Sequence, residues 1–136
     1  MKDMVIQTLG LTKKFNKLTA VKNLDLQVPK GALYGFLGLN GAGKSTTIRM
    51  LLGLMKPTQG QVFIFNKDIR KNPMEILSQV GSLVETPSYC GHLTVWENLE
   101  ITRKILELDE REIDKVLSLV NLTKWKNIRL KDVTLG

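Results

Sequence analysis

The sequence predicts an α/β fold, and three observations support this prediction. Residues 38–45, Gly-Leu-Asn-Gly-Ala-Gly-Lys-Ser, match the pattern of a phosphate-binding loop, which joins a strand to a helix. The residues before this loop have the apolar runs of strands, broken by turn residues. Beyond about position 93, apolar side chains recur at helical spacing instead. We therefore expect a β-rich beginning, a mixed middle and a helical end.

The composition is that of an ordinary globular chain. Its 136 residues are 43% hydrophobic and 24% charged, and no apolar run approaches the roughly 20 residues that a membrane-spanning helix requires. The single cysteine, Cys90, excludes an internal disulfide and fits a reducing cytoplasm. The net charge is +7, but the basic residues are spread along the chain without interleaved aromatic residues. This distribution predicts a solvated basic surface and no nucleic-acid partner.

The residues before the phosphate loop predict strands and turns. We expect strands at residues 5–7 and 21–28, and Pro29-Lys30-Gly31 interrupts the second of them. The apolar run 32–37 predicts the strand that leads into the loop.

After the loop, apolar residues at helical spacing predict a helix that ends near Gly53. Four further segments follow from turn residues and apolar runs: a turn at 56–60, a strand at 62–65, a short helix at 74–79 and a strand-like stretch at 80–84.

Two start signals predict the C-terminal helices. Thr94 and Glu97 have the spacing of a capping box, in which each side chain bonds a backbone N–H of the other residue. Asp109 and Glu112 repeat this spacing before a stripe of apolar residues.

The phosphate loop carries the clearest chemistry. Its glycines let backbone N–H groups approach phosphate oxygens without a Cβ in the way. Lys44 then offers a positive charge to the β- and γ-phosphates, and the Ser45 hydroxyl can bind Mg²⁺. The alternative is an ordinary glycine-rich turn, which the strand-like run before the loop and the helical run after it disfavour. The predicted nucleotide-binding residues of this loop are Gly38, Leu39, Asn40, Gly41, Ala42, Gly43, Lys44, Ser45 and Thr46.

Two further segments resemble the ATP-binding subunit of ABC transporters. Phe15 precedes Lys44 by 29 residues, where that family has an aromatic residue that stacks on adenine. Taken alone, Phe15 would more often be a core residue, but the phosphate loop at the family's spacing favours the stacking role. The segment 53–62 is similar to the family's residues after the loop helix. The resemblance implies a P-loop NTPase fold that binds ATP and Mg²⁺. It has a RecA-like core with an N-terminal antiparallel β-subdomain in residues 1–93, and an incomplete α-helical subdomain in residues 94–136.

Glu85 departs from the family pattern. Most members have a glutamine at this position, which contacts Mg²⁺ and the attacking water. A glutamate here, followed by the segment 93–99, resembles a subgroup associated with bacitracin resistance and lantibiotic self-protection. The resemblance makes Glu85 a metal-binding and catalytic candidate beside Lys44, because a carboxylate can also ligate a hard cation. The alternative is a solvated loop carboxylate.

Other family landmarks are missing from the sequence. The run 105–110 ends in Asp109-Glu110, but Glu107 interrupts it and the run falls on a predicted helix, so we do not assign it as the catalytic Asp-Glu strand. Residues 133–136 resemble only the opening of the family signature. We therefore expect a truncated domain, little more than half of the family's length, that binds ATP without turning it over. The complete family domain hydrolyses ATP as a head-to-tail dimer.

The resemblance implies the energy-coupling subunit of an ABC exporter for an antimicrobial peptide or drug. Its expected partners are a membrane permease, contacted within residues 86–98 at the cytoplasmic face of the membrane, and a second ATP-binding subunit. Trp96 is either an anchor of the permease contact or a core residue. Two alternatives stay open: a soluble ABC-type ATPase that acts on ribosomes or DNA, and a nucleotide-binding remnant without turnover. The transported substrate does not follow from the sequence.

Overall fold

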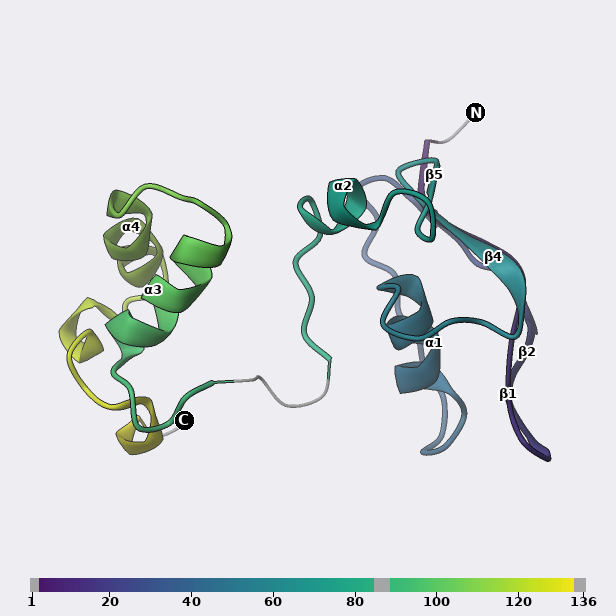
Figure 1. The fold of residues 1–136 in the computed structure, drawn as a ribbon, viewed down its shortest axis with the longest axis horizontal. Helices are drawn as coiled ribbons and strands as arrows, with labels where there is room; N and C mark the ends of the chain where they lie inside the picture. Colours follow the sequence, from purple (N-terminus) through teal and green to yellow (C-terminus); the bar gives the residue numbers. More distant parts are fainter. Residues whose placement is uncertain (1–2, 85–88, 134–136) are drawn as a thin grey trace. The chain divides into compact units, whose positions relative to one another are not determined.

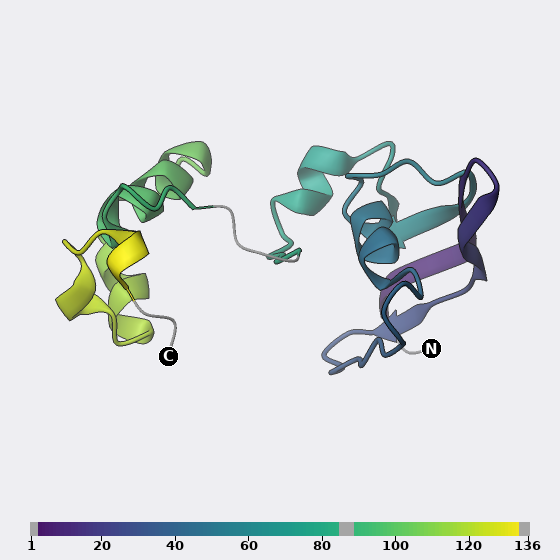
Figure 2. The same cartoon turned by 90° about the horizontal axis from the view of Figure 1, so that it is seen from below.

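We describe a computed structural model of the chain, which covers residues 3–84 and 89–133 and is drawn in Figures 1 and 2. The chain divides into two compact units, residues 1–86 and 87–136, and each unit is described by itself. The domain boundary expected between residues 93 and 94 remains a prediction. None of the described helices is long and apolar enough to cross a membrane.

The first unit contains a five-stranded antiparallel sheet (Figure 1). The sheet has the order β2-β1-β4-β5, and β3 also pairs with β1. Its strands are β1 (Met4–Phe15), β2 (Leu18–Leu24), β3 (Gln27–Pro29), β4 (Gln59–Ile64) and β5 (Lys67–Asp68). The strand predicted at 5–7 lies in β1, which is much longer, and the strand predicted at 62–65 overlaps β4, which begins earlier at Gln59 and ends at Ile64. The run 21–28, predicted as one strand, is interrupted between β2 and β3.

Two glycines let β1 and β4 approach each other at an irregular point of their pairing. The register shifts between Leu9 and Thr12, where Gly10 has a φ of 56° and Gly60 a φ of 87°. A Cβ at Gly60 would lie 2.5 Å from the Gly10 carbonyl oxygen. An irregularity of this kind bends a strand, and here the first half of β1 pairs with β3 and the second half with β2.

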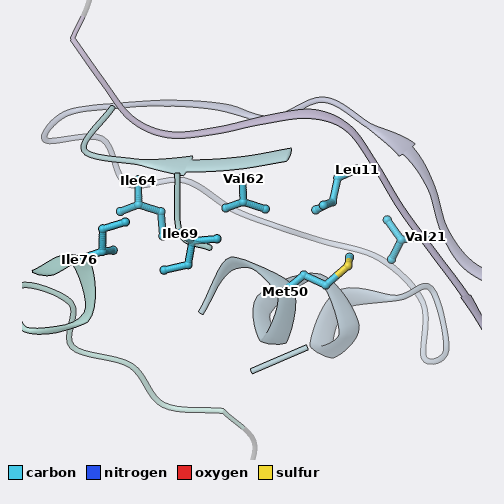
Figure 3. Packing of buried hydrophobic residues seen from close by; sticks show 7 residues of the cluster. All are labelled: Leu11, Val21, Met50, Val62, Ile64, Ile69 and Ile76. Carbon is cyan, nitrogen blue, oxygen red and sulfur yellow. The ribbon is translucent and has the colours of Figure 1, made fainter. Parts of the chain in front are cut away.

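One helix covers the sheet and closes the main core of the unit. Helix α1 (Lys44–Leu51) places Met50 among strand residues, and the short helix α2 (Pro73–Leu77) adds Ile76. Figure 3 shows these side chains converging between α1 and the strands. The core cluster consists of Leu11, Val21, Met50, Val62, Ile64, Ile69 and Ile76. Burial of such residues from water is the main stabilising contribution to a unit of this size.

The start of α1 lies directly against β2. Gly43, the residue before the helix, has a φ of 88°, in the left-handed region that favours glycine. A Cβ at this position would stand 2.3 Å from the carbonyl oxygen of Ala20 and 3.0 Å from a methyl carbon of Val21. The absence of a side chain at Gly43 therefore allows the loop and the strand to meet.

Two predicted strands do not form. Residues 32–37 and 80–84 have no regular secondary structure, and within the described residues no strand pairs with either run. An extended run becomes a strand only when a neighbouring strand takes up its backbone hydrogen bonds, and β1 to β5 pair only among themselves. As a result, the side chains of Leu33 and Leu37 are almost fully exposed.

The second unit packs helix α3 (Val95–Ile105) against helix α4 (Arg111–Leu119), followed by the 3₁₀ turns η1 (Thr123–Trp125) and η2 (Leu130–Asp132). Val95, Ile113 and Leu117 form its buried centre. Partly buried apolar side chains surround this centre: Trp96, Leu99, Leu122, Leu130 and Val133.

The capping box predicted for α3 is confirmed. The Thr94 hydroxyl accepts a bond from the Glu97 N–H at 3.1 Å, and the Thr94 N–H donates to the Glu97 carboxylate at 2.7 Å. The bond from the Thr94 N–H, together with one from the Thr94 hydroxyl to the same carboxylate at 3.0 Å, lowers the pKa of Glu97 below its ordinary value. The start predicted at Asp109 has a different form. Asp109 accepts from the Arg111 N–H instead of forming a second capping box.

A later segment of the chain satisfies the other free N–H groups at the start of α3. The N–H of Val95 donates to Ile128 at 3.0 Å, and that of Trp96 donates to Lys126 at 3.0 Å. The N–H of Leu130 donates back to Leu93 at 2.9 Å. Because the first N–H groups of a helix have no partner within it, these bonds fix the segment 126–130 beside the helix start.

We predict that the chain self-associates in solution. The exposed apolar side chains of residues 32–39 and of α4 are free to contact other chains. Light scattering during size-exclusion chromatography should show species above the monomer mass that grow with concentration. A monodisperse monomer that melts cooperatively would contradict this prediction.

Replacement of Thr94 by alanine should lower the free energy of unfolding of the second unit by about 1 kcal/mol. The Glu97 carboxylate contributes to the free energy of unfolding. This contribution is fully present above the pKa that the carboxyl has in the unfolded chain, and it is lost as the pH falls through the lower pKa that it has in the folded chain. Acidification should therefore lower the free energy of unfolding of the parent chain by more than that of the Thr94→Ala variant, as measured by urea unfolding followed by circular dichroism. Thr94→Ser, which keeps the capping hydroxyl, is the control. Equal stability of all three chains would show that the capping box contributes nothing.

Two glycine substitutions in the phosphate loop should lower the free energy of unfolding by different amounts. Gly41 and Gly43 both have positive φ values, but a Cβ at Gly41 would meet nothing within 4 Å. Gly41→Ala should therefore cost only the backbone strain of about 1–2 kcal/mol, whereas Gly43→Ala must also displace the Ala20 carbonyl and should cost clearly more. The urea midpoints of the two variants measure the difference. If they coincide, the contact between the loop and β2 has no energetic weight.

Candidate functional site

The phosphate loop is a compact turn that ends where α1 begins. Residues 38–43 have no helical or strand structure, and the Ala42 N–H donates to the Leu39 carbonyl at 3.1 Å. The helix starts at Lys44, as the motif predicts, and its first turn contains no acidic residue. The N-terminal end of a helix carries a partial positive charge and free N–H groups. The loop therefore presents an electropositive surface to an anion.

The Lys44 side chain folds back over the loop. Its ammonium donates to the carbonyl oxygens of Gly38 at 2.6 Å and Leu39 at 2.7 Å. An ammonium group has three N–H donors, so one donor remains for a further acceptor such as a phosphate oxygen. Lys44 therefore combines two tasks, since it closes the loop and keeps its charge at the place where a phosphate would lie.

The hydroxyl residues that follow Lys44 divide into two kinds. Ser45 and Thr46 lie half-buried in the first turn of α1, and the Ser45 hydroxyl has no hydrogen-bond partner within residues 3–84 and 89–133. Thr47 is buried, and both its hydroxyl and its N–H donate to the Gly43 carbonyl, at 2.9 and 2.8 Å. Thr47 is not among the site residues predicted from the sequence. The signal was the third hydroxyl residue in succession, placed one turn after Gly43.

Phe15 lies at the end of β1, on the hairpin that β1 forms with β2. It pairs with Leu18, and its side chain is partly exposed, at 43%. The same hairpin contacts the phosphate loop, because Ala20 and Val21 lie against Gly43. The sheet therefore connects the two predicted parts of the site, the aromatic side chain and the loop, through a few residues of β2. The partial exposure of Phe15 argues against a core position for its side chain.

The predicted acidic residue of the site, Glu85, lies outside the described residues. Asp109 and Glu110, which were not assigned as the catalytic Asp-Glu pair, lie in the exposed loop before α4. The Arg111 side chain donates to the Asp109 carboxylate at 3.0 and 3.2 Å, and these bonds lower the pKa of Asp109. Asp109 is therefore half of a surface ion pair, which does not suit it to take up a proton as a base.

The first unit also has a cavity of about 660 Å³, which is separate from the phosphate loop. It opens between the end of α1 and the segment from β5 to α2, and apolar side chains such as Met55, Ile69 and Leu77 line most of it. No residue of the phosphate loop contributes to its lining.

The comparison with known sequences agrees with this geometry. Residues 21–136 match the ABC transporter family. The bacitracin transport ATP-binding protein BcrA of Bacillus licheniformis is 50% identical over 119 residues, which cover 87% of this chain and 39% of the relative. The protein of the same name from Enterococcus faecalis is 41% identical over 98% of this chain and 44% of its own length. The daunorubicin/doxorubicin resistance ATP-binding protein DrrA of Streptomyces peucetius is 45% identical over 69% of this chain and 28% of its own.

Solved structures show the same fold. The ATP-binding subunit of an ABC transporter aligns with a TM-score of 0.81 and 25% identity, over 96% of this chain and 56% of that one. MJ1267, an ATP-binding cassette of an ABC transporter, aligns with a TM-score of 0.80 and 26% identity, over 98% of this chain and 60% of the other.

The chain spans about two fifths of the length of the two bacitracin transport relatives. The family match covers most of its own residues, including the phosphate loop and the helical unit. The antiparallel sheet, the loop and the helices agree with the N-terminal part of a P-loop NTPase domain. The chain therefore belongs to the ABC transporter family, as an ATP-binding component.

Proposed function

We propose that this chain binds ATP and supplies the energy-coupling part of an exporter for an antimicrobial peptide or a drug. The observation that carries the proposal is the phosphate loop, in which Lys44 lies at the start of α1 and bonds back across the loop. The electropositive end of the helix and the remaining N–H of Lys44 together suit a polyphosphate. The loop residues 38–46 are the proposed nucleotide-binding residues.

Phe15 is the proposed stacking surface for the base. Its ring is partly exposed, and its hairpin contacts the loop at Gly43. Stacking of a base on an aromatic ring contributes about 1–3 kcal/mol and reads no hydrogen-bonding edge. A purine nucleotide is therefore expected, without discrimination between adenine and guanine by this residue.

The residues of the loop provide part of the ligand set that Mg²⁺ needs. The Ser45 hydroxyl, which has no hydrogen-bond partner among the described residues, offers an oxygen ligand in the first turn of α1, and Mg²⁺ prefers oxygen ligands in an octahedral arrangement. One hydroxyl provides a single ligand, so phosphate oxygens, water and the proposed ligand Glu85 would complete the set. When bound, the ion would neutralise charge on the phosphates.

The proposed cargo and partners rest on the relatives. Two relatives are named for bacitracin transport, and one is named for resistance to daunorubicin and doxorubicin. By analogy, this chain would act at the cytoplasmic face of a membrane with a permease, which it would contact within residues 86–98, and with a second ATP-binding subunit. Trp96 packs in part against the buried centre of the second unit, which favours a structural role for this residue.

We further propose that the 136-residue chain alone binds ATP without turning it over. Phosphoryl transfer to water needs a positioned water or base besides a phosphate cradle. Within the described residues, no Asp-Glu pair lies on a strand, and Asp109 is engaged with Arg111. Lys44 and Glu85 are the proposed catalytic residues, and Glu85 alone would have to position the water.

Titration with a fluorescent ATP analogue and Mg²⁺ tests this proposal. The parent chain should bind, whereas Lys44→Ala should lose most of the affinity, because the loop then lacks both its closing bonds and its positive charge. Phosphate release, monitored in parallel, should stay at background. A Lys14→Ala variant removes one positive charge from an exposed position of β1 and should bind like the parent chain.

Absence of binding in a sample that circular dichroism shows to be folded would overturn the proposed ATP site. Lys44-dependent phosphate release would overturn the proposed lack of turnover, and Glu85→Gln would then show whether Glu85 acts as the base.

A further inference from the structure

Lys13 connects Phe15 to the turn that follows helix α1. Its ammonium lies over the Phe15 ring, 5.2 Å from the ring centroid, and donates to the carbonyl oxygen of Lys56 at 2.7 Å. A cation over the face of an aromatic ring is attracted by the electron density of the ring. The bond to Lys56 holds this cation in place. One side chain therefore contacts the ring and the turn at the same time.

The turn at 56–58 is itself fastened to β1 on both sides of Lys13. The Thr58 N–H donates to the Thr12 carbonyl at 2.9 Å, and the Lys14 N–H donates to the Thr58 hydroxyl at 3.0 Å. This turn begins a few residues after the end of α1, the helix whose start follows the phosphate loop, so Lys13 joins Phe15 to the segment behind that helix. The segments before and after α1 thus contact the same hairpin, through Gly43 and through residues 56–58.

The contact with Lys13 affects how the Phe15 ring can bind a ligand. The ring stands near the end of a hairpin, and Phe15 is partly exposed there. Lys13 lies over the ring, and the partial exposure of Phe15 leaves ring surface that a flat ligand can reach. A ring held in one orientation binds such a ligand more tightly than a rotating ring, because binding then restricts less motion.

We propose that Lys13 is a positioning residue for the base-stacking site, which holds the Phe15 ring so that a purine stacks on its exposed surface. This inference rests on the proposed function, since it assumes that a nucleotide binds at the loop and at Phe15. Lys13 acts through Phe15 and does not itself contact the phosphates. Its effect should therefore depend on the base of the ligand and on the presence of the ring.

The test compares ATP with inorganic tripolyphosphate, which offers the phosphates without a base, both in the presence of Mg²⁺. Lys13→Met keeps the length of the side chain and removes its charge. We expect it to weaken ATP binding by up to about fivefold, because the ring must then be ordered on binding and one exposed cation–π contact limits the size of this effect, and to leave tripolyphosphate binding unchanged. Lys13→Arg should restore ATP binding, because a guanidinium can also lie over the ring and donate to Lys56.

A double-mutant cycle gives the decisive comparison. In a Phe15→Leu chain, Lys13→Met should have no further effect on ATP binding, because there is no ring left to hold. Lys14→Met is the matched control, since it removes an equal charge one residue away without a ring contact. The inference is overturned if Lys13→Met weakens both ligands equally, if its effect persists without Phe15, or if Lys14→Met has the same effect.

A measurement without ligand separates this inference from the proposed function. The ring current of Phe15 should shift the side-chain methylene protons of Lys13 upfield in the NMR spectrum, and Phe15→Leu should abolish the shift. If the shift is present but the parent chain binds neither ATP nor tripolyphosphate, the proposed function fails while the Lys13–Phe15 contact stands as structure only. If the shift is absent, the positioning role fails even where ATP binds.

Discussion

The close contact between Gly43 and the Ala20 carbonyl fixes the place of the phosphate loop on the sheet. A Cβ at Gly43 would stand 2.3 Å from that oxygen, and the backbone has a left-handed φ that suits glycine. Thr47 secures the same residue from the other side, through two bonds to the Gly43 carbonyl. The start of α1, and with it the position of Lys44, depends on this small set of contacts.

The hairpin of β1 and β2 consequently does more than complete a sheet. It receives the loop at Ala20 and carries Phe15 at its end. It also holds the turn at 56–58 through bonds donated by Lys13 and Lys14, and through the Thr12 carbonyl, which accepts from the Thr58 N–H. The proposed base site and phosphate site thus share one support, and the paired strands of the hairpin set their separation.

Sequence reasoning predicted local features well, because local features depend on residues close together in the chain. The phosphate loop, the helix start at Lys44 and the capping box of Thr94 and Glu97 each need only a short motif. It failed at residues 32–37 and 80–84, since apolar composition says nothing about whether a partner strand lies alongside. It also missed the contact of Lys13 with Lys56, which joins residues 43 positions apart.

The second unit has a feature with a different consequence. The N–H of Leu130 bonds to Leu93 at 2.9 Å, and Arg129 pairs with Thr94, so the stretch of chain between these residues begins and ends at the same point. Units with adjacent ends tolerate a change in chain connectivity, because a short linker can join the old ends while new ends are opened elsewhere. The exposed loop between α3 and α4 offers a natural place for such new ends. The helical segment between these residues is thus suited to circular permutation, with new ends opened at this loop.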